Sequence, residues 1–432
     1  MNLTVQPSGP LRGAITVPGD KSITHRALML SALADGPSRI EGYLDGGDCR
    51  ATISCLRAMG IEVGVQPEAL TVHGRGLNGW REPDAPIDCV RSGTTMRLLA
   101  GLLAGQPFYS VLSGAAQLRR RPMDRVTQPL ATMGARIWGR DGGRRPPLSI
   151  QGGGLQGATH DLPVASAQVK SCLLLAGLYA QGRTVVVEPG PSRDHTERML
   201  RARGVGVESR DLTHTIGGPA NHLAPLDVRV PADCSSAAFF IVAALLLGDS
   251  NLLISDVGVN PTRTGLLDAL AAMGATVEQT GPRDQGGEPL ADLRICPQSL
   301  RGAELGGNLV PRMIDEFPIL ALAATQAEGT TIVRDAAELR VKETDRIDTL
   351  VAEMTKLGAD IQPRPDGFVI RGPMPLRGAN VDSHGDHRLG MTLAIAGLLA
   401  EGQTTVHHAE CIADSFPGFA ETLRSLGAEV TV

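Results

Sequence analysis

The sequence predicts an α/β protein of two similar domains, and three observations support this prediction. A short pattern ending in glycine recurs six times, six strongly apolar stretches alternate with it, and glycine and proline together supply 52 and 29 of the 432 residues. Frequent glycine and proline imply many tight turns between short elements. Six repeats exceed what one hydrophobic core usually accommodates, so we expect three repeats in each of two domains.

The glycine pattern predicts six surface helices. Each copy has a large apolar residue four positions before a glycine, and a β-branched residue follows soon after; the glycines are Gly60, Gly134, Gly204, Gly274, Gly358 and Gly427. Glycine readily adopts the left-handed conformation that ends a helix, so we expect a helix before each glycine and a strand after it. The fifth helix is amphipathic, because apolar residues recur at the helical period at Ile347, Leu350, Val351, Met354 and Leu357.

The apolar stretches predict six buried helices, at residues 27–36, 96–105, 169–182, 237–248, 317–329 and 389–402. A helix that is apolar on all sides must be buried on all sides. Each repeat therefore holds one buried helix, one surface helix and several short strands. We place the domains at 14–230 and 231–432, with residues 1–13 pairing back onto the second. A stack of solenoid repeats is the alternative, but 69 to 84 residues per repeat is long for one.

Composition excludes several classes of protein. A net charge of −5 and an aromatic content of 3% argue against a nucleic acid or a membrane as the main partner. Seven cysteines without a C-x-x-C pair predict buried thiols in a reducing compartment, with no disulfide framework and no metal site. The N-terminus lacks a signal peptide and residues 237–247 are too short to cross a bilayer, so we expect a cytoplasmic protein. No motif for a metalloprotease, an NTPase or a dinucleotide is present.

Cations stand where the predicted buried helices begin. A helix N-terminus favours anionic side chains by about 0.3–1 kcal/mol each, yet four of the six openings carry Lys or Arg, at 21–26, 91–97, 166–170 and 386–388. A bound anion would satisfy both the cations and the free N–H groups of the helix. Two further segments, 119–125 and 340–346, add arginines, whose forked donors suit phosphate and carboxylate. We therefore predict a substrate with several phosphates or carboxylates.

Each of these segments also has an ordinary structural interpretation. Residues 119–125 fit a solvated surface loop, and residues 340–346 fit a charged helix start. His195 and His387 fit structural histidines. Helix capping accounts equally well for Lys21, Ser22, Ser166, Gln168, Asp315 and Glu316. What favours function is that these residues occupy equivalent points of a sixfold repeat.

Six motifs resemble those of the 5-enolpyruvylshikimate-3-phosphate synthase family. In chain order they are Gly19-Asp20-Lys21-Ser22, Arg121-Pro122-Met123, the segment 166–170, Asn260-Pro261-Thr262-Arg263, the segment 340–346 and Asp386-His387-Arg388. The resemblance runs from about residue 6 to the C-terminus. It implies an inside-out α/β fold of two domains, each of three βαβαββ repeats, with the active site in the interdomain cleft.

The resemblance also implies an activity. The family transfers the enolpyruvyl (1-carboxyvinyl) group of phosphoenolpyruvate to the 5-hydroxyl of 3-phosphoshikimate and releases phosphate, in the shikimate pathway to chorismate and the aromatic amino acids. Both substrates are polyanions, which fits the cationic helix openings. The resemblance further implies a monomer that needs no metal and no organic cofactor, binds small-molecule substrates, and is the target of glyphosate.

The family's site residues carry over to matching positions here. Contacts to 3-phosphoshikimate are implied for Lys21, Ser22, Arg26, Ser166, Ala167, Gln168, Arg193, Asp315 and Lys342. Contacts to phosphoenolpyruvate are implied for Lys21, Gly93, Arg121, Gln168, Lys342, Arg346 and Arg388. The implied catalytic residues are Asp315, which accepts the proton of the hydroxyl, Glu343, which protonates C3 of the enol, and Lys21, which stabilises charge.

Some positions depart from the family pattern. Arg91 stands where many members have Asn, and Asp414 stands where some have a Lys that binds phosphoenolpyruvate, so Arg91 is expected to replace part of that charge. The segments 19–22, 166–170, 193–197 and 260–263 resemble the glyphosate-insensitive class, whereas Gly93 resembles sensitive members; we expect intermediate tolerance.

Three alternatives stand beside the family's reaction. A UDP-N-acetylglucosamine 1-carboxyvinyltransferase would have a cysteine in the loop 115–121 and Asn directly after the lysine. This chain has no cysteine in that loop, and Ser22 follows Lys21. An RNA-end cyclase is disfavoured by the low aromatic content and the negative charge. A non-catalytic anion-binding repeat protein would need the cations but neither Asp315 nor Glu343.

Overall fold

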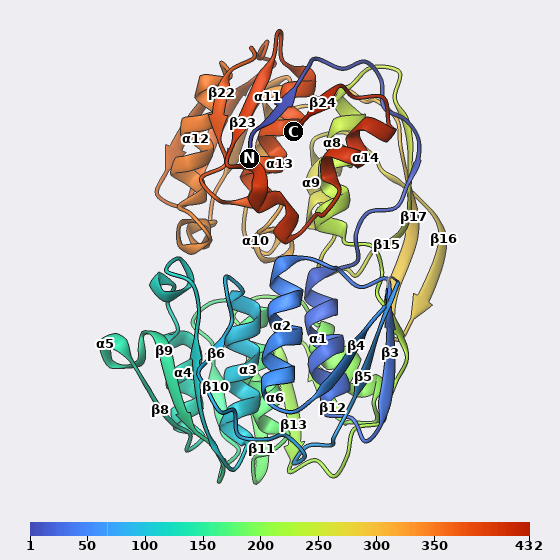
Figure 1. Ribbon diagram of the computed structural model, residues 1–432. Helices are drawn as coiled ribbons and strands as arrows, with labels where there is room; N and C mark the ends of the chain where they lie inside the picture. Colours follow the sequence, from blue (N-terminus) through green and yellow to red (C-terminus); the bar gives the residue numbers. More distant parts are fainter. Residues whose placement is uncertain (67) are drawn as a thin grey trace. The chain divides into compact units, whose positions relative to one another are not determined.

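A computed structural model describes residues 1–66 and 68–432 (Figure 1). The chain divides into two compact units. The first unit comprises Gly19–Val230 and Gln285–Glu288, and the second comprises Met1–Pro18, Pro231–Asp284 and Pro289–Val432. Residues 14–18, which we had placed with the N-terminal domain, belong to the second unit. The reason is that β2 (Arg12–Ile15) pairs in parallel with β15 (Asn251–Gly258).

Six four-stranded sheets, three in each unit, share one topology in the described part of the chain. One of them contains β6 (Ile87–Asp88), β7 (Tyr109–Ser113), β9 (Arg145–Gln151) and β8 (Arg136–Gly139), in that spatial order. Its first pair is parallel and the other two pairs are antiparallel. A helix follows each of β6 and β7 in the sequence, so the chain order is βαβαββ. The repeat implied by the family resemblance is confirmed.

The other five sheets complete the two units. In the first unit they are β14 (Val228–Arg229), β3 (Pro37–Glu41), β5 (Ala69–His73) and β4 (Glu62–Val65), and β10 (Thr159–Asp161), β11 (Gly182–Val187), β13 (Thr213–Gly218) and β12 (Val207–Arg210). In the second unit they are β16 (Glu278–Gln285), β17 (Glu288–Ile295), β15 and β2; β18 (Glu304–Leu305), β19 (Gly329–Val333), β21 (Gly367–Gly372) and β20 (Asp360–Arg364); and β22 (Asn380–Asp382), β23 (Thr404–His407), β1 (Leu3–Val5) and β24 (Val430–Thr431).

Three repeats are completed by a strand that is remote in the sequence. β14, at the end of the first unit, supplies the first strand of the first repeat. β2 does the same for the fourth repeat, and β1 pairs with β23 and β24 to close the sixth. The N-terminal strands of the chain therefore pair with strands from its C-terminal half.

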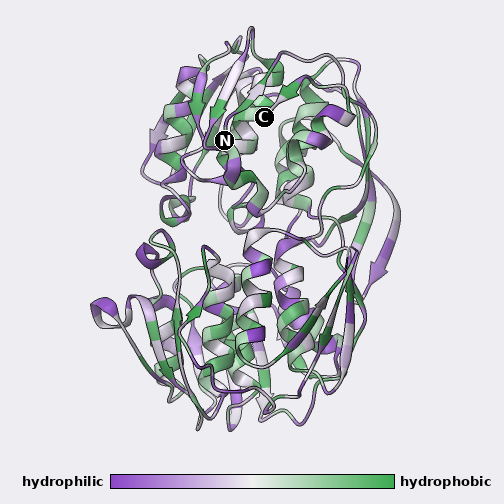
Figure 2. Cartoon of the chain, viewed as in Figure 1, coloured by the Kyte–Doolittle hydropathy of each residue, from purple (hydrophilic) through white to green (hydrophobic). Residues whose placement is uncertain are grey.

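The buried helices lie at the centre of each unit with the sheets around them, as Figures 1 and 2 show. They are α1 (Lys21–Ala32), α3 (Gly93–Gly105), α6 (Ala167–Gly177), α8 (Cys234–Leu246), α11 (Phe317–Thr325) and α13 (His387–Leu399). Each of the six apolar stretches contains a buried helix, as predicted, but in five of them the helix ends two to five residues before the stretch does. Several begin earlier than expected because polar residues of the first turn, such as Thr24, His25 and Arg26, are buried as well.

The surface helices end where the glycine pattern predicts. They are α2 (Gly47–Ala58), α4 (Asp124–Thr132), α7 (His195–Ala202), α9 (Gly265–Ala272), α12 (Arg346–Lys356) and α14 (Phe419–Ser425). The six glycines that follow have φ between +82° and +96°, a conformation that L side chains rarely adopt. In α12 the predicted apolar face is buried, with Val351 partly so.

The cysteines agree with the prediction of buried thiols at all but one position. Six cysteines are buried free thiols, but Cys296 is exposed, because it follows β17 at the end of a surface strand. In the described part of the chain, no group of His, Cys, Asp and Glu side chains has the arrangement of a metal site. No helix there is both long and apolar enough to span a membrane.

Candidate functional site

Arg26 is the centre of a polar cluster in the first unit. Its side chain is buried, and its guanidinium donates to Thr196 Oγ1 and Ser171 Oγ, both at 2.7 Å, and to the carbonyl of Ser22 at 2.9 Å. Burial lowers the pKa of Arg26 to about 10, while the charge of Glu197 opposes that shift. The guanidinium remains charged at neutral pH, and the three oxygens that accept its hydrogen bonds are uncharged.

Ser22 and Arg193 meet at the N-terminus of α1. Nη1 of Arg193 donates to Oγ of Ser22 at 3.4 Å, so the segment before α7 reaches the first turn of α1. Lys21, the first residue of α1, instead donates to Asp48 Oδ2 at 3.3 Å. Both side chains of that pair are 17% exposed, so the ammonium lies at the surface of the unit with one carboxylate beside it.

Gln168 joins the openings of α3 and α6. Its amide oxygen accepts from Arg97 Nη1 at 2.6 Å, and its amide nitrogen donates to Thr94 Oγ1 at 2.8 Å. Arg121 lies over the same opening, since a Cβ built at Gly93 would lie 2.9 Å from Arg121 Nη1. The absence of a side chain at Gly93 thus allows the close approach of this guanidinium.

Ser166 and Ala167 lie at the start of α6. Ser166 is the N-cap residue, but its side chain makes no capping hydrogen bond, and both residues are partly exposed. The capping interpretation of Ser166 is therefore wrong. Its hydroxyl and the first N–H groups of α6 lie beside Gln168.

Lys170 corrects one inference from the sequence. We counted it among cations that call for a bound anion, but its ammonium is buried between Glu188, at 2.7 Å, and Glu197, at 2.8 Å. His214 also contacts the Glu188 carboxylate, at 3.1 Å. Lys170 is therefore neutralised by the protein itself, because one carboxylate from the residue after β11 and one from α7 lie against it.

Arg346 gathers the acidic residues of the second unit. Its guanidinium donates to Asp386 Oδ2 at 2.7 Å, to Glu343 Oε2 at 2.8 Å and to Asp315 Oδ1 at 3.1 Å. Burial alone would lower its pKa, but these three carboxylates outweigh burial and raise it. Asp315 and Glu343 are 21% and 24% exposed, so each keeps one side open to solvent while Arg346 holds the other.

Lys342 precedes this cluster. Its ammonium lies 3.5 Å from Glu338 and its side chain is 19% exposed. Burial lowers the pKa of Lys342, although Glu338 and Asp315 oppose the shift. An anion beside Lys342 would restore the stability of the charged form.

Arg388 differs from the other buried arginines. It lies in the first turn of α13, is 3% exposed, and its Nε and Nη1 are buried with no hydrogen-bond partner among the described residues. Its neighbour Asp386 is the N-cap, which accepts from the backbone N–H groups of Arg388 and Leu389 as well as from Arg346. A buried guanidinium without a partner costs free energy, so this side chain points to a ligand that accepts hydrogen bonds.

The remaining sequence predictions have simple positions. Arg91 is exposed before α3, and Asp414 is partly exposed at the end of the 3₁₀ turn Ala409–Asp414. Glu316 is the N-cap residue of α11, but its side chain makes no capping hydrogen bond, so capping by this side chain is wrong, as for Ser166. His195 is buried against Glu288, at 2.8 Å, as expected of a structural histidine.

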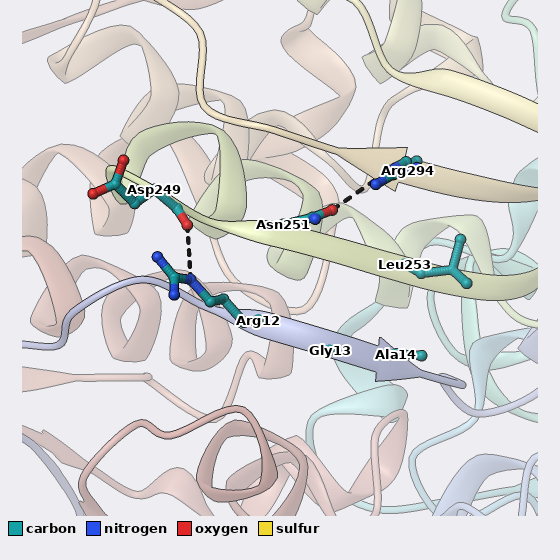
Figure 3. Close-up of a pocket in the computed structure, with 7 residues that line it drawn as sticks. All are labelled: Arg12, Gly13, Ala14, Asp249, Asn251, Leu253 and Arg294. Carbon is teal, nitrogen blue, oxygen red and sulfur yellow. Dashed lines mark hydrogen bonds between the residues drawn. The ribbon is translucent and has the colours of Figure 1, made fainter.

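A hollow lies elsewhere in the second unit. It has a volume of about 770 Å³ and is lined by Arg12, Gly13, Ala14, Asp249, Asn251, Leu253 and Arg294 (Figure 3). Arg12 and Arg294 donate to the Asp249 carbonyl and to Asn251. None of the candidate residues lines this hollow, which lies along strands β2 and β15.

Sequence reasoning missed several partners of the candidate residues. Thr196 and Ser171 hold Arg26, and Asp386 holds Arg346. Asp386 stood in one of the quoted motifs, so its position beside a cation was visible. Nothing in the spacing of Ser171 and Thr196 indicated that they would converge on Arg26.

Comparisons with known proteins point to one family. A family model described as EPSP synthase (3-phosphoshikimate 1-carboxyvinyltransferase) matches residues 5–423. A curated relative from Geobacter sp. (strain M21), named 3-phosphoshikimate 1-carboxyvinyltransferase, is 54% identical over 98% of both chains. A relative of the same name from Bacillus cereus (strain ZK / E33L) is 52% identical over 98% of this chain and 99% of its own.

Solved structures show the same fold. The structure of EPSP synthase from Acinetobacter baumannii has a TM-score of 0.89 and 43% identity over the full length of both chains. The enolpyruvyl transferase NikO from Streptomyces tendae has a TM-score of 0.83 over 100% of this chain and 98% of its own. NikO is 23% identical, so it supports the fold alone.

Proposed function

This chain belongs to the EPSP synthase (3-phosphoshikimate 1-carboxyvinyltransferase) family, and from that premise we propose how its residues carry out the reaction. The protein transfers the enolpyruvyl group of phosphoenolpyruvate to the 5-hydroxyl of 3-phosphoshikimate and releases phosphate. The names of the relatives support this reaction and give no support to the UDP-N-acetylglucosamine alternative or to a non-catalytic protein.

The first unit supplies most of the contacts to 3-phosphoshikimate, and Asp315 and Lys342 of the second unit are the further contacts that the resemblance implies. Ser22, Arg26 and Arg193 form a connected set, and the hydroxyl of Ser166 and the first N–H groups of α6 lie on the neighbouring helix. Charged guanidinium groups held by neutral oxygens keep their charge available to an anion. Gln168 and Ala167 complete this group. Lys21 adds an ammonium group that would contact a substrate anion in place of Asp48.

Cations in both units bind phosphoenolpyruvate. Arg121 lies over Gly93 at the opening of α3, and the buried Arg388 lacks partners for two nitrogens. Arg388 is the observation that carries the proposal, because a phosphate or carboxylate accepts hydrogen bonds from both of these nitrogens. Lys342 and Arg346 serve the same substrate.

Proton transfer belongs to the second unit. Asp315 accepts the proton of the attacking 5-hydroxyl, and Glu343 donates a proton to C3 of the enol. The electron pair of the hydroxyl oxygen forms the bond to C2 of phosphoenolpyruvate as C3 takes up the proton. The bond from C2 to the phosphate oxygen then breaks while Glu343 takes a proton back from C3, so the C2–C3 double bond forms again and phosphate leaves. Arg346 touches both carboxylates and so fixes their orientation. Lys21 and Lys342 stabilise charge as the bond at C2 forms.

The remaining expectations are part of the same proposal. The two units correspond to two domains that divide between Val230 and Pro231. The enzyme acts as a monomer in the cytoplasm, where its six buried thiols stay reduced. It needs neither a metal nor an organic cofactor, and it is a target of glyphosate with intermediate tolerance.

Phosphate release tests the proposal. The protein is incubated with phosphoenolpyruvate and either 3-phosphoshikimate or UDP-N-acetylglucosamine, beside the Glu343→Gln variant. We expect release only with 3-phosphoshikimate, and a loss of about 10²-fold or more in the variant. Asp348→Asn is the matched control, because this carboxylate of α12 is 63% exposed and pairs with Arg340. Release only with the sugar nucleotide, or full activity of Glu343→Gln, would contradict the proposal.

A further inference from the structure

The segments 119–125 and 140–145 of the first unit form a dense cationic surface that substrate binding does not explain. They contain seven arginines and two aspartates, whereas the whole chain has a net charge of −5. Only Arg121 among these seven has an assigned role. We name the two segments together the basic rim.

Three contacts fasten the two segments of the basic rim to each other. Arg140 Nη2 donates to the carbonyl of Arg119 at 2.7 Å, and the backbone N–H of Met123 donates to the carbonyl of Arg144 at 2.8 Å. Thr127 donates to the carbonyl of Gly143 at 3.1 Å. The tip of the β8–β9 hairpin, α5 (Arg140–Gly143), is therefore held against the loop that contains Arg121. Figure 1 shows this tip at the outer side of the unit, and Figure 2 shows it as hydrophilic.

The basic rim is also fastened to the opening of α3. Arg97 Nη2 donates to the carbonyl of Pro122 at 3.1 Å, and Arg121 lies within contact of Gly93. The basic rim is thus held beside Gly93 and Arg121, two of the proposed phosphoenolpyruvate contacts. These contacts fix the positions of its backbone segments.

Several charges of the rim have no partner within the protein. Arg120 and Arg144 are exposed, and their side chains make no hydrogen bond or ion pair with a described residue. Arg145 is 52% exposed and meets only Asp141, at 3.3 Å, across an exposed pair. Such pairs contribute little to stability, so neither packing nor ion pairing accounts for these three arginines.

We propose that Arg120, Arg144 and Arg145 attract the polyanionic substrates toward Arg121 and so raise the rate of productive encounter, without touching the bound substrates. This inference rests on the proposed role of Arg121. Like charges gathered at the edge of a binding site raise the local concentration of an oppositely charged ligand, by 10-fold to 10³-fold in favourable cases. The effect acts over a Debye length, about 30 Å at 0.01 M salt and about 3 Å at 1 M.

The test is the triple variant Arg120→Gln/Arg144→Gln/Arg145→Gln, assayed as kcat/KM for each substrate against ionic strength. At about 10 mM salt we expect a loss of about three- to tenfold in kcat/KM, with kcat unchanged. At about 1 M salt the ratio of variant to wild type should return to within about 1.5-fold. The variant should fold normally, because all three side chains are exposed.

A matched control removes the same charge at another end of the same unit. Arg75→Gln/Arg81→Gln/Arg183→Gln changes three exposed arginines. The backbone N–H groups of Arg75 and Arg81 donate to the carbonyls of Ala32 and Met59, at the C-terminal ends of α1 and α2. We expect this control to lose less than about 1.5-fold. An equal loss in the control would assign the effect to net charge alone. A loss that persists at high salt would assign it to direct contact or structure, and either result overturns the proposal.

Binding of 3-phosphoshikimate, measured by calorimetry without turnover, separates this inference from the reaction itself. The same salt-dependent ratio of affinities is expected there. If turnover is normal but the affinities of the triple variant and the unmodified protein for 3-phosphoshikimate do not differ at low salt, only the role of the basic rim is overturned. The expected binding ratio in a protein that releases no phosphate would overturn the proposed site chemistry only.

Discussion

The two units share one fold, yet their buried helices open with different chemistry. The N-cap residues are Asp20, Ser92 and Ser166 in the first unit and Asp233, Glu316 and Asp386 in the second. The first unit thus has one carboxylate at these positions and the second has three. The repeat supplies positions at which side chains converge, and the residue types placed there decide whether a unit binds anions or holds carboxylates.

The arginines of the two units reflect the same difference. In the first unit Arg26 donates to hydroxyl and carbonyl oxygens. In the second unit Arg263 donates to Asp233 and Arg346 donates to three carboxylates. A cation held by neutral oxygens keeps its attraction for an anionic ligand, whereas a cation held by carboxylates orients them. The first unit is therefore suited to binding and the second to proton transfer.

Asp315→Asn and Arg193→Gln test this difference most strongly. Asp315→Asn removes the acceptor of the hydroxyl proton, so kcat should fall about 10²- to 10⁴-fold with a small change in KM. Arg193→Gln removes a charged contact in the first unit, so the KM for 3-phosphoshikimate should rise while kcat changes little. Steady-state kinetics of both variants gives the answer. If both variants lower kcat alike, the division of roles between the units is wrong.

Arg388→Met and Arg263→Met sharpen the comparison within the second unit. Both arginines are buried near helix openings, but Arg263 pairs with Asp233 at 2.7 Å while Arg388 leaves two nitrogens without partners. Arg388→Met should raise the KM for phosphoenolpyruvate about 100-fold, since hydrogen bonds between charged groups contribute about 1.5–3 kcal/mol. Without ligand it should stabilise the protein by about 1 kcal/mol, because it removes a buried unpaired group.

Arg263→Met should have the opposite effect on stability. It leaves the buried Asp233 without its cation, which costs about 3 kcal/mol or more. Thermal unfolding of both variants without substrates measures this contrast. A lower Tm for Arg388→Met than for the unmodified protein would show that Arg388 is satisfied by the protein and would remove its main support as a ligand contact.

The response to acid should differ between the units by a smaller amount. His25 is fully buried in α1 of the first unit and bonds Thr52 at 2.7 Å, and burial lowers its pKa from 6.5 to about 4. Burial also lowers the pKa of His160, in the same unit. The unfolded chain therefore takes up a proton near pH 6.5 that the folded unit does not accept until about pH 4. The stabilisation is complete above pH 6.5 and is lost as the pH falls toward 4.

The loss attributed to His25 should approach about 3 kcal/mol at the acid end of this window. Hydrogen exchange between pH 7 and pH 4.5 measures it unit by unit, with the amides of α1 and α3 losing protection before those of α11 and α13. His25→Gln keeps a partner for Thr52 and should reduce the pH dependence of the first unit. Equal slopes for the variant and the unmodified protein would exclude His25 as the cause.

Much of the fold was predictable because its signals are local. The six glycine positions and six apolar stretches reflect chain conformation and burial, which depend on neighbouring residues. The candidate residues were predictable in type, because cations at helix openings break a local rule. Their partners were not predictable, as Lys170 shows: the carboxylate of Glu188 that neutralises it follows β11, and that of Glu197 comes from α7.

The sequence alone determined the number of repeats, the end of each surface helix and the excess of cations at the buried openings. Tertiary structure alone decided which strands complete each sheet, because β14, β2 and β1 are remote from the repeats they close. It also decided which cations pair with carboxylates of the protein and which remain available to a ligand. Lys170 and Arg388 lie at similar positions near the start of a buried helix. Lys170 pairs with two carboxylates, whereas Nε and Nη1 of Arg388 have no partner in the described part of the chain. Only folding brings those two carboxylates within reach of Lys170, because they lie 18 and 27 residues away in the sequence.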